Sequence, residues 1–448
     1  MFEQSENLRH AAELQEQNDY DGAIAVFSEA IRDNPKRAEA YFGRGNAYEA
    51  KGLLDEAIAD YNAVIRYSPR ESMAYYNRGS TYVKKGDRIH AIVDFTDALR
   101  IDPNYAKAYY NRGLAHFKNG DLEKAKTDYS DAIRHDPRDA DAYVSRALLH
   151  LVRGENDEAI ADCDEAIRID PENTKAHGNR GNALESKGDL AAATAAYSEV
   201  LRINPSDAKA LANRAMVYFK QGEYQQAIAD YSQAMRHNPG SSKWYCGRGC
   251  AYAKRGQTDK ALADYGEALR LDPKNVEARL YRGLTRKAKG DRDGALADFS
   301  EAVADDPQCA KAWRHRATLY GLMGQLDRAV SDFTQAAKLD PSDAATYCQR
   351  GIANTRRNEL LGAIGDFSKA IELRSDYSQA YYNRGLVYMI KNQLDHAIAD
   401  FDAVIRCDAT FAQAFYNRAL AYKKQGDVAR CQADFAEAER LKQAAAQS

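Results

Sequence analysis

The chain has 448 residues, 44% of them hydrophobic and 29% charged, with a formal net charge of −3. That charge gives no reason to expect nucleic-acid binding, and no run approaches the roughly 18 apolar residues that span a bilayer. The seven cysteines are scattered and odd in number, which favours a reducing, cytoplasmic compartment over a disulfide framework.

All ten prolines lie 34 residues apart, from Pro35 to Pro341. Taking proline as slot 32 of a 34-residue repeat divides the chain, without insertion or deletion, into thirteen repeats within a single domain, 4–445. They are 4–37, 38–71, 72–105, 106–139, 140–173, 174–207, 208–241, 242–275, 276–309, 310–343, 344–377, 378–411 and 412–445.

The sequence pattern of each repeat predicts two helices, which gives 26 helices in all. Slot 15 is always Gly or Asn, as at Asn18 and Gly86, and these residues end a helix because they accept a left-handed backbone. Gly or Ala at slot 8 and Ala at slot 20 let the two helices approach closely, and the aromatic residue usual at slot 24 fills the space beside them.

This pattern resembles the tetratricopeptide repeat over residues 4–445. The resemblance implies an all-α, right-handed superhelical solenoid of thirteen antiparallel helix pairs. It also implies that slots 2, 5, 6, 9, 12 and 13 of the first helices line a concave groove. The polar residues of repeat one, such as Asn7, and Gln432 and Glu439 in repeat thirteen replace stacking residues, so we expect both ends to be capped and the array to be complete.

Slot 7 departs from the family, which usually has leucine there. This chain has Arg at slot 7 in twelve repeats and Asp at slot 23 in eleven, and we expect the two to form ion pairs. Repeat six is an internal control, because Arg180 faces Ala196. The alternative is that both slots are independently solvated.

Slot 6 is Asn in six repeats, and some family members use asparagines at this slot to hold the backbone of an extended peptide. We expect the amides of Asn77, Asn111, Asn179 and Asn213 to point into the groove, unpaired within the protein. The alternative is a purely structural preference for Asn here. The six are Asn77, Asn111, Asn179, Asn213, Asn383 and Asn417.

Positive charge is concentrated in the predicted groove, because its slots hold fifteen basic and six acidic residues although the whole chain has a net charge of −3. This favours an acidic peptide, although lysine is also a good exposed helix former. The predicted peptide-binding cations are Lys107, Lys243, Lys287, Lys311 and Arg314. Some family members bind a terminal carboxylate with a clamp of Asn, Lys and Arg side chains. This chain matches the clamp only in part, at Asn46–Asn77–Lys107 and at Asn182–Asn213–Lys243.

No catalytic motif is present: there is no phosphate-binding loop, no Gly-x-Ser-x-Gly and no His-Glu-x-x-His. Cys246 and Cys250 share a helix face, but no histidine is suitably spaced to complete a metal site. We therefore expect a monomeric, non-enzymatic scaffold without metal or cofactor, which binds an extended, acidic segment of a protein partner. The alternative is a regulatory or substrate-targeting subunit of an enzyme on another chain.

Overall fold

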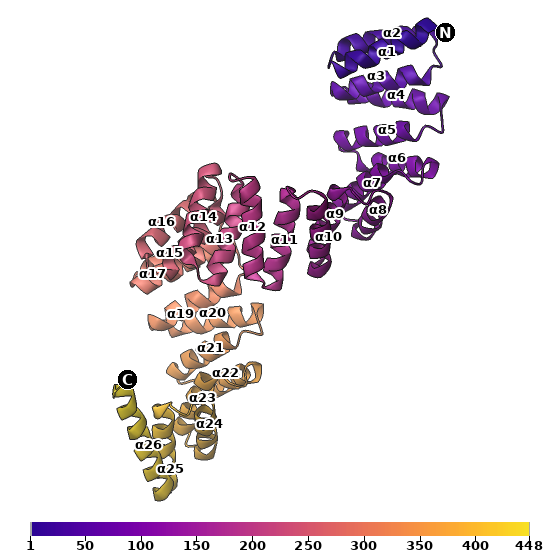
Figure 1. Cartoon of the computed structure of the whole chain (residues 1–448). Coiled ribbons are helices and arrows are strands. Elements are labelled where there is room, and N and C mark those ends of the chain that lie inside the picture. Colours follow the sequence, from indigo (N-terminus) through magenta and orange to yellow (C-terminus); the bar gives the residue numbers. More distant parts are fainter. Residues whose placement is uncertain (1, 448) are drawn as a thin grey trace. The chain divides into compact units, whose positions relative to one another are not determined.

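The computed structural model describes residues 2–447, and within them every element of secondary structure is an α-helix. The helices follow one another as consecutive pairs, two to a repeat (Figure 1). The first helices are α1 (Phe2–Glu16), α3 (Ala38–Ala50), α5 (Ser72–Lys85), α7 (Ala106–Lys118), α9 (Ala140–Arg153), α11 (Thr174–Lys187), α13 (Ala208–Gln221), α15 (Ser242–Lys254), α17 (Val276–Lys289), α19 (Ala310–Leu322), α21 (Ala344–Arg356), α23 (Ser378–Ile390) and α25 (Ala412–Gln425). The second helices are α2 (Tyr20–Asp33), α4 (Leu54–Tyr67), α6 (Arg88–Ile101), α8 (Leu122–His135), α10 (Asn156–Ile169), α12 (Leu190–Ile203), α14 (Tyr224–His237), α16 (Thr258–Leu271), α18 (Arg292–Asp305), α20 (Leu326–Leu339), α22 (Leu360–Leu373), α24 (Leu394–Cys407) and α26 (Val428–Gln447).

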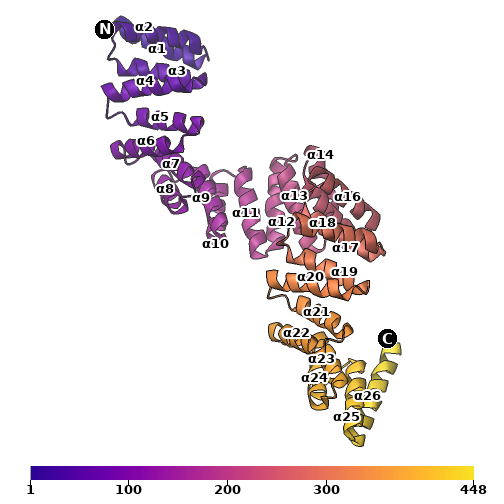
Figure 2. The same cartoon turned by 180° about the vertical axis from the view of Figure 1, so that it is seen from behind.

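The chain forms two compact units, Met1–His237 and Asn238–Ser448. Within each unit, a helix pair packs against the pair that follows it in sequence, and first helices of neighbouring repeats also touch, as α3 does α5 and α21 does α23. The view from behind shows the same succession of pairs in each unit (Figure 2). Each unit is therefore an all-α solenoid segment whose packing is local in sequence.

The residue at slot 15 ends the first helix in every repeat, as predicted. The positive-φ residues between 2 and 447 are three asparagines and ten glycines, all at this slot, for example Gly86 at φ 86° and Asn358 at φ 62°. The left-handed residue turns the chain so that the second helix can begin within a few residues.

Close helix approach explains the small residue at slot 8. A Cβ atom added to Gly113 would stand 2.8 Å from the Tyr129 ring, and one added to Gly79 would stand 2.9 Å from the Phe95 ring. Both rings belong to slot 24 and are almost fully buried. In the repeats with glycine at slot 8, the core is therefore an aromatic ring packed against the backbone of the partner helix.

Proline is not what ends the second helices. Repeats eleven and twelve have Ser375 and Ala409 at slot 32, yet α22 and α24 end where their counterparts do. Only α26 is longer, at 20 residues against 14 in the other second helices. Gln432 and Glu439 on α26 are exposed, whereas the side chain of Asn7, on which the expected N-terminal cap rests, lies outside the described residues.

The predicted pairing of slots 7 and 23 is confirmed. Eleven arginines donate to the aspartate sixteen positions later in the same repeat, usually from both Nε and Nη2, as Arg214 does to Asp230 at 2.7 and 3.0 Å. The other pairs are Arg44–Asp60, Arg78–Asp94, Arg112–Asp128, Arg146–Asp162, Arg248–Asp264, Arg282–Asp298, Arg316–Asp332, Arg350–Asp366, Arg384–Asp400 and Arg418–Asp434.

At least eight of these eleven arginines also donate to a side chain at slot 25 of the preceding repeat. Nη1 of Arg214 donates to the Ser198 hydroxyl at slot 25 of the preceding repeat at 3.0 Å, and Arg146 donates to Ser130 in the same way. The guanidinium group of Arg248 lies between two tyrosine rings, each 5.7 Å from it. One side chain thus joins three helices, so the pairs stabilise both the repeat and its junction with the previous one.

Candidate functional site

The surface examined for binding is the first-helix face, which we define as slots 2, 5, 6, 9, 12 and 13 of the first helices. These positions recur with helical spacing, so they share one side of each helix. Contacts between neighbouring first helices extend this side across several repeats within each compact unit.

The expectation that the slot-6 asparagines are unpaired is wrong. Their amide nitrogens bond to the preceding repeat: Asn77 to Oδ1 of Asn46 at 3.0 Å, and Asn111 to the Tyr76 hydroxyl at 2.7 Å. Asn417 donates to the Tyr382 hydroxyl at 2.9 Å. These three asparagines therefore link adjacent first helices, because each donates a hydrogen bond to a side-chain oxygen on the first helix of the preceding repeat.

Asn179 and Asn213 follow the same trend with weaker geometry, whereas the buried amide nitrogen of Asn383 has no hydrogen-bond partner among the described residues. Asn179 lies 3.5 Å from the carbonyl oxygen of Val144, and Asn213 lies 3.4 Å from Oδ1 of Asn182. The amide nitrogen of Asn383 is buried, and this side chain lies against the Cys348 thiol, whose pKa is raised chiefly by burial. All six asparagines are partly exposed, so each is shared between an inter-repeat contact and solvent.

A five-residue polar network appears twice in the first compact unit. The Tyr61 hydroxyl donates to Oδ1 of Asn46 at 2.8 Å and to Oε2 of Glu49 at 3.1 Å, and Lys84 of the next repeat pairs with Glu49 at 2.9 Å. Asn77 completes the network through its bond to Asn46. Burial, with Glu49 adding to it, raises the pKa of Tyr61, so the phenol stays protonated and donates.

The second copy lies four repeats later. The Tyr197 hydroxyl donates to Asn182 at 2.7 Å and to Glu185 at 3.3 Å, and Lys220 pairs with Glu185 at 2.8 Å. This network was not predicted from the sequence, although only repeats two and six combine Asn at slot 9, Glu at slot 12 and Tyr at slot 24, and this combination is its signal.

The two networks coincide with the two partial carboxylate clamps. In each, a glutamate of the chain itself neutralises a lysine on the first-helix face, Lys84 or Lys220. An incoming carboxylate would meet this fixed negative charge. The networks therefore weigh against binding of a terminal carboxylate at these two places.

The other lysines of the first-helix face form no ion pair. Ten of them have no carboxylate within 4.0 Å among residues 2–447, and all but Lys287 are exposed; they are Lys107, Lys118, Lys175, Lys209, Lys243, Lys254, Lys287, Lys311, Lys423 and Lys424. In contrast, four of the five lysines at slot 14, just beyond this face, pair with a carboxylate of the preceding repeat. Lys289 pairs with Asp259 at 2.7 Å, and Lys51, Lys85 and Lys187 pair with Asp21, Asp55 and Asp157; the fifth lysine, Lys391, forms no such pair with a described residue.

The first-helix face changes character at repeats nine and ten. Here slots 5 and 6 hold Arg314 and His315 on α19, Lys311 lies one turn earlier on the same helix, and Lys287 belongs to α17. Arg314 Nη1 lies 3.3 Å from Oδ2 of Asp343. The His315 ring stacks on Phe299 with centroids 5.6 Å apart. Burial, and then the charges of Arg314, Lys287 and Lys311, lower the pKa of His315 to about 4.

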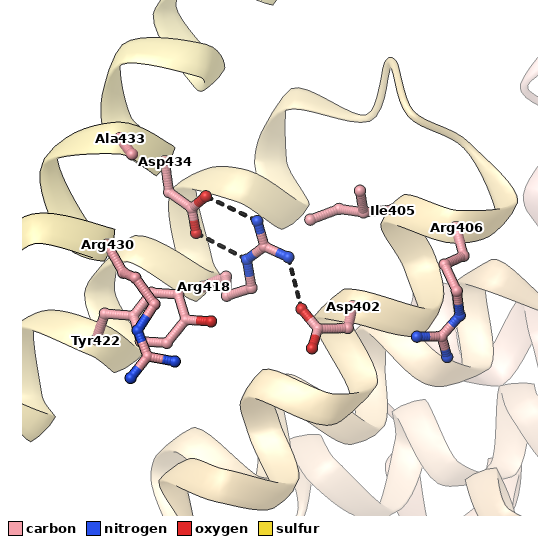
Figure 3. A pocket seen from close by; sticks show the side chains of 8 residues that line it. All are labelled: Asp402, Ile405, Arg406, Arg418, Tyr422, Arg430, Ala433 and Asp434. Carbon is pink, nitrogen blue, oxygen red and sulfur yellow. Dashed lines mark hydrogen bonds and ion pairs between the residues drawn. The ribbon is translucent and has the colours of Figure 1, made fainter. Parts of the chain in front are cut away.

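A cavity of about 390 Å³ lies between α24, α25 and α26, away from the first-helix face (Figure 3). Arg418 crosses it and bonds Asp402 of repeat twelve at 2.5 Å and Asp434 of its own repeat at 2.7 Å. Arg430 lines it with its guanidinium 4.5 Å from the Tyr422 ring and pairs with Asp427. The cavity thus surrounds Arg418, the last arginine of the slot-7 series. The positive charge of this arginine is already neutralised by Asp402 and Asp434.

Cys246 and Cys250 lie one turn apart on α15, and the Tyr265 hydroxyl donates to the Cys250 sulfur at 3.5 Å. All seven cysteines are free thiols. Within residues 2–447, no three side chains of His, Cys, Asp or Glu gather closely enough to hold a metal ion. In the same part of the chain, every helix is too short or too polar to cross a membrane.

Family models place these features in context. Tetratricopeptide repeat models match residues 8–72, 110–174, 283–344, 208–241 and 412–444, and a TPR repeat model matches 90–120, 181–222, 249–290 and 386–426. The chain belongs to the tetratricopeptide repeat family. Its architecture is that of a protein-interaction scaffold, since helical repeats of this family present extended binding surfaces.

The chain is similar to a number of solved structures, whereas no curated protein matches it. MamA is 28% identical over 37% of this chain and 97% of its own, with a TM-score of 0.36. A tetratricopeptide repeat protein from Parabacteroides merdae is 24% identical over 55% of this chain and 98% of its own, with a TM-score of 0.46. Cut9 of the APC/C Cut9–Hcn1 tetramer is 15% identical over 96% of this chain and 92% of its own, with a TM-score of 0.42.

Proposed function

We propose that this tetratricopeptide repeat protein binds an extended, acidic segment of a partner protein along its first-helix face. The observation that carries the proposal is the contrast between two sets of lysines. Four of the five lysines at slot 14 are neutralised by carboxylates of the chain, whereas ten on the first-helix face are not. Unpaired charges of one sign on one face raise the local concentration of an oppositely charged partner.

Repeat spacing makes an extended partner a better fit than a compact one. Lysines at slot 2 recur in repeats four, six, seven, eight and ten, as Lys107, Lys175, Lys209, Lys243 and Lys311. Each compact unit therefore offers its charges at intervals along the stacked first helices. A partner with acidic residues distributed along an extended backbone can meet several of them at once.

We assign the slot-6 asparagines a secondary part in this binding. Their amide nitrogens already bond the preceding repeat, which fixes the spacing of the first helices. Their second N–H group and partly exposed oxygen are the groups that a peptide backbone could use. Binding energy is thus expected to come mainly from the lysines.

The proposal is tested with two sets of charge-removing variants. In the test set, Lys107, Lys175, Lys243 and Lys311 become Gln; in the matched control, Lys51, Lys85, Lys187 and Lys289 become Gln. The probe is a fluorescein-labelled peptide of alternating Glu and Gly, followed by anisotropy. At about 0.5 kcal/mol for each exposed charge, the test set should lose tenfold or more in affinity.

The control variant should bind the Glu–Gly peptide almost as tightly as the unchanged protein does. A neutral peptide of alternating Gln and Gly should not bind to the unchanged protein or to either variant. Equal losses in both sets would show that only net charge matters and would overturn the proposal. Capture of partners followed by mass spectrometry addresses the alternative, since consistent recovery of one catalytic chain would make this protein a regulatory or targeting subunit.

A further inference from the structure

Repeats nine and ten carry a positive cluster that is not part of the regular pattern. Slots 5 and 6 of the first-helix face are Tyr and Asn in repeats three and four, for example Tyr110 and Asn111, but Arg314 and His315 here. Lys311, one helical turn from His315, and Lys287 of α17 add two more cations. We name Lys287, Lys311, Arg314 and His315 the α17–α19 cluster.

The charge of this cluster is poorly compensated. Asp343 is the carboxylate that pairs with Arg314, at 3.3 Å. That carboxylate also caps α21, since it accepts hydrogen bonds from the Ala345 N–H at 3.1 Å and the Thr346 hydroxyl at 2.6 Å. Neither Lys287 nor Lys311 has a carboxylate within 4.0 Å among the described residues. Three cations therefore face one shared anion, which leaves about two positive charges.

We propose that the α17–α19 cluster is a binding site for the phosphoryl group of a phosphorylated serine or threonine within the extended segment. The proposal deepens the proposed function, on which it rests, by naming the group that anchors the segment. A phosphate monoester carries about −1.5 to −2 charges near neutral pH and offers three acceptor oxygens. A single carboxylate would neutralise only half of the cluster.

The donors present suit such a group. Lys287 and Lys311 supply ammonium groups, and Arg314 supplies the guanidinium N–H groups that Asp343 leaves free, which are suited to phosphate oxygens. The His315 ring is held against Phe299. Since its pKa is lowered to about 4 by burial and by the three cations, His315 is neutral at pH 7 and retains one N–H donor.

The cluster differs from the rest of the first-helix face in this concentration of charge. Lys243 and Lys254, both on α15, are also exposed and unpaired, but they lie eleven residues apart, at slots 2 and 13 of one helix, and have no arginine on this face beside them. Such isolated lysines suit the distributed charge of an acidic segment. They also provide a control matched in residue type and compact unit.

His315 supplies a reporter for the test. The probes are N-acetyl-O-phosphoserine amide, its unphosphorylated counterpart and N-acetylglutamate amide, each titrated into the full chain with ¹³C-labelled histidine. His315→Asn identifies the His315 signal among the nine histidines. Phosphoserine should shift this signal saturably and bind about tenfold or more tightly than the glutamate probe, and its binding should raise the pKa of His315 because the nearby positive charge is neutralised.

Two double variants decide the assignment. Lys287→Met with Lys311→Met should weaken phosphoserine binding about tenfold or more, whereas Lys243→Met with Lys254→Met should leave it unchanged. Absence of a saturable His315 shift, or equal affinity for phosphoserine and glutamate, would overturn the phosphoryl assignment. Binding of the Glu–Gly peptide is measured on the same samples: if it persists, the proposed function stands without its anchor, and if it is also absent, both proposals fail.

Discussion

Arg180 donates its Nε hydrogen to Oδ1 of Asp164, a residue of the preceding repeat, at 2.7 Å. The other eleven slot-7 arginines bind an aspartate within their own repeat, but in repeat six that position is Ala196. Arg418 shows both arrangements together, since it bonds Asp402 of the preceding repeat and Asp434 of its own. The arginine can thus serve either the repeat or the junction, depending on where the carboxylate lies.

Replacing a slot-7 arginine by leucine should be costly wherever the aspartate is buried. In Arg214→Leu, the buried Asp230 would lose its partner, and removing one member of a buried ion pair costs about 3–5 kcal/mol. In Arg180→Leu, Asp164 is 53% exposed and can be solvated, so the loss should be under about 1 kcal/mol. Thermal denaturation of both variants checks this, and similar melting temperatures would contradict it.

Sequence alone predicted the helix pairs, the slot-15 turns and the ion pairs because each depends on residues within one repeat. Gly86 needs only its own backbone angle to end a helix, and Arg44 needs only Asp60. The roles of Asn77 and Lys84 were not predictable in the same way. Their partners, Asn46 and Glu49, belong to the preceding repeat, so their pairing depends on the geometry of the junction.

Removing the amide groups of the slot-6 asparagines should therefore affect the stability of the protein more than its binding of the peptide. Asn77→Ala with Asn111→Ala removes two inter-repeat hydrogen bonds, of 3.0 and 2.7 Å, each contributing about 0.5–1.5 kcal/mol. We expect a lower melting temperature and little change in affinity for the Glu–Gly peptide. Met73→Ala with Val83→Ala, at exposed and uncharged positions of α5, controls for side-chain truncation. A large loss of affinity without a change in melting temperature would instead give the asparagines the leading role in binding.

Removing the internal anions should strengthen acidic-peptide binding. In Glu49→Gln with Glu185→Gln, Lys84 and Lys220 lose their carboxylate partners at 2.9 and 2.8 Å and become available to the peptide. The amide still accepts hydrogen bonds from Tyr61 and Tyr197, so the network retains its geometry. Affinity for the Glu–Gly peptide should rise severalfold, and the gain should shrink at 1 M salt, where the Debye screening length falls to about 3 Å. Glu39→Gln with Asp141→Asn, which removes two exposed, unpaired carboxylates of the same face, should give a smaller gain because no lysine is released.

The buried imidazole of His315 should make the second compact unit sensitive to acid. Its pKa is lowered to about 4, first by burial and then by Arg314, Lys287 and Lys311. In the unfolded chain it should be near 6.5, so between these values the unfolded state binds more protons and stability falls as the pH falls. The full effect is at most about 3 kcal/mol, from 1.36 kcal/mol for each pH unit. His315→Asn should remove this part of the pH dependence of thermal denaturation between pH 7 and 4. Lys311→Met should raise the pKa of His315 measured by NMR, because one repelling charge is gone; an unchanged value would show that burial alone sets it.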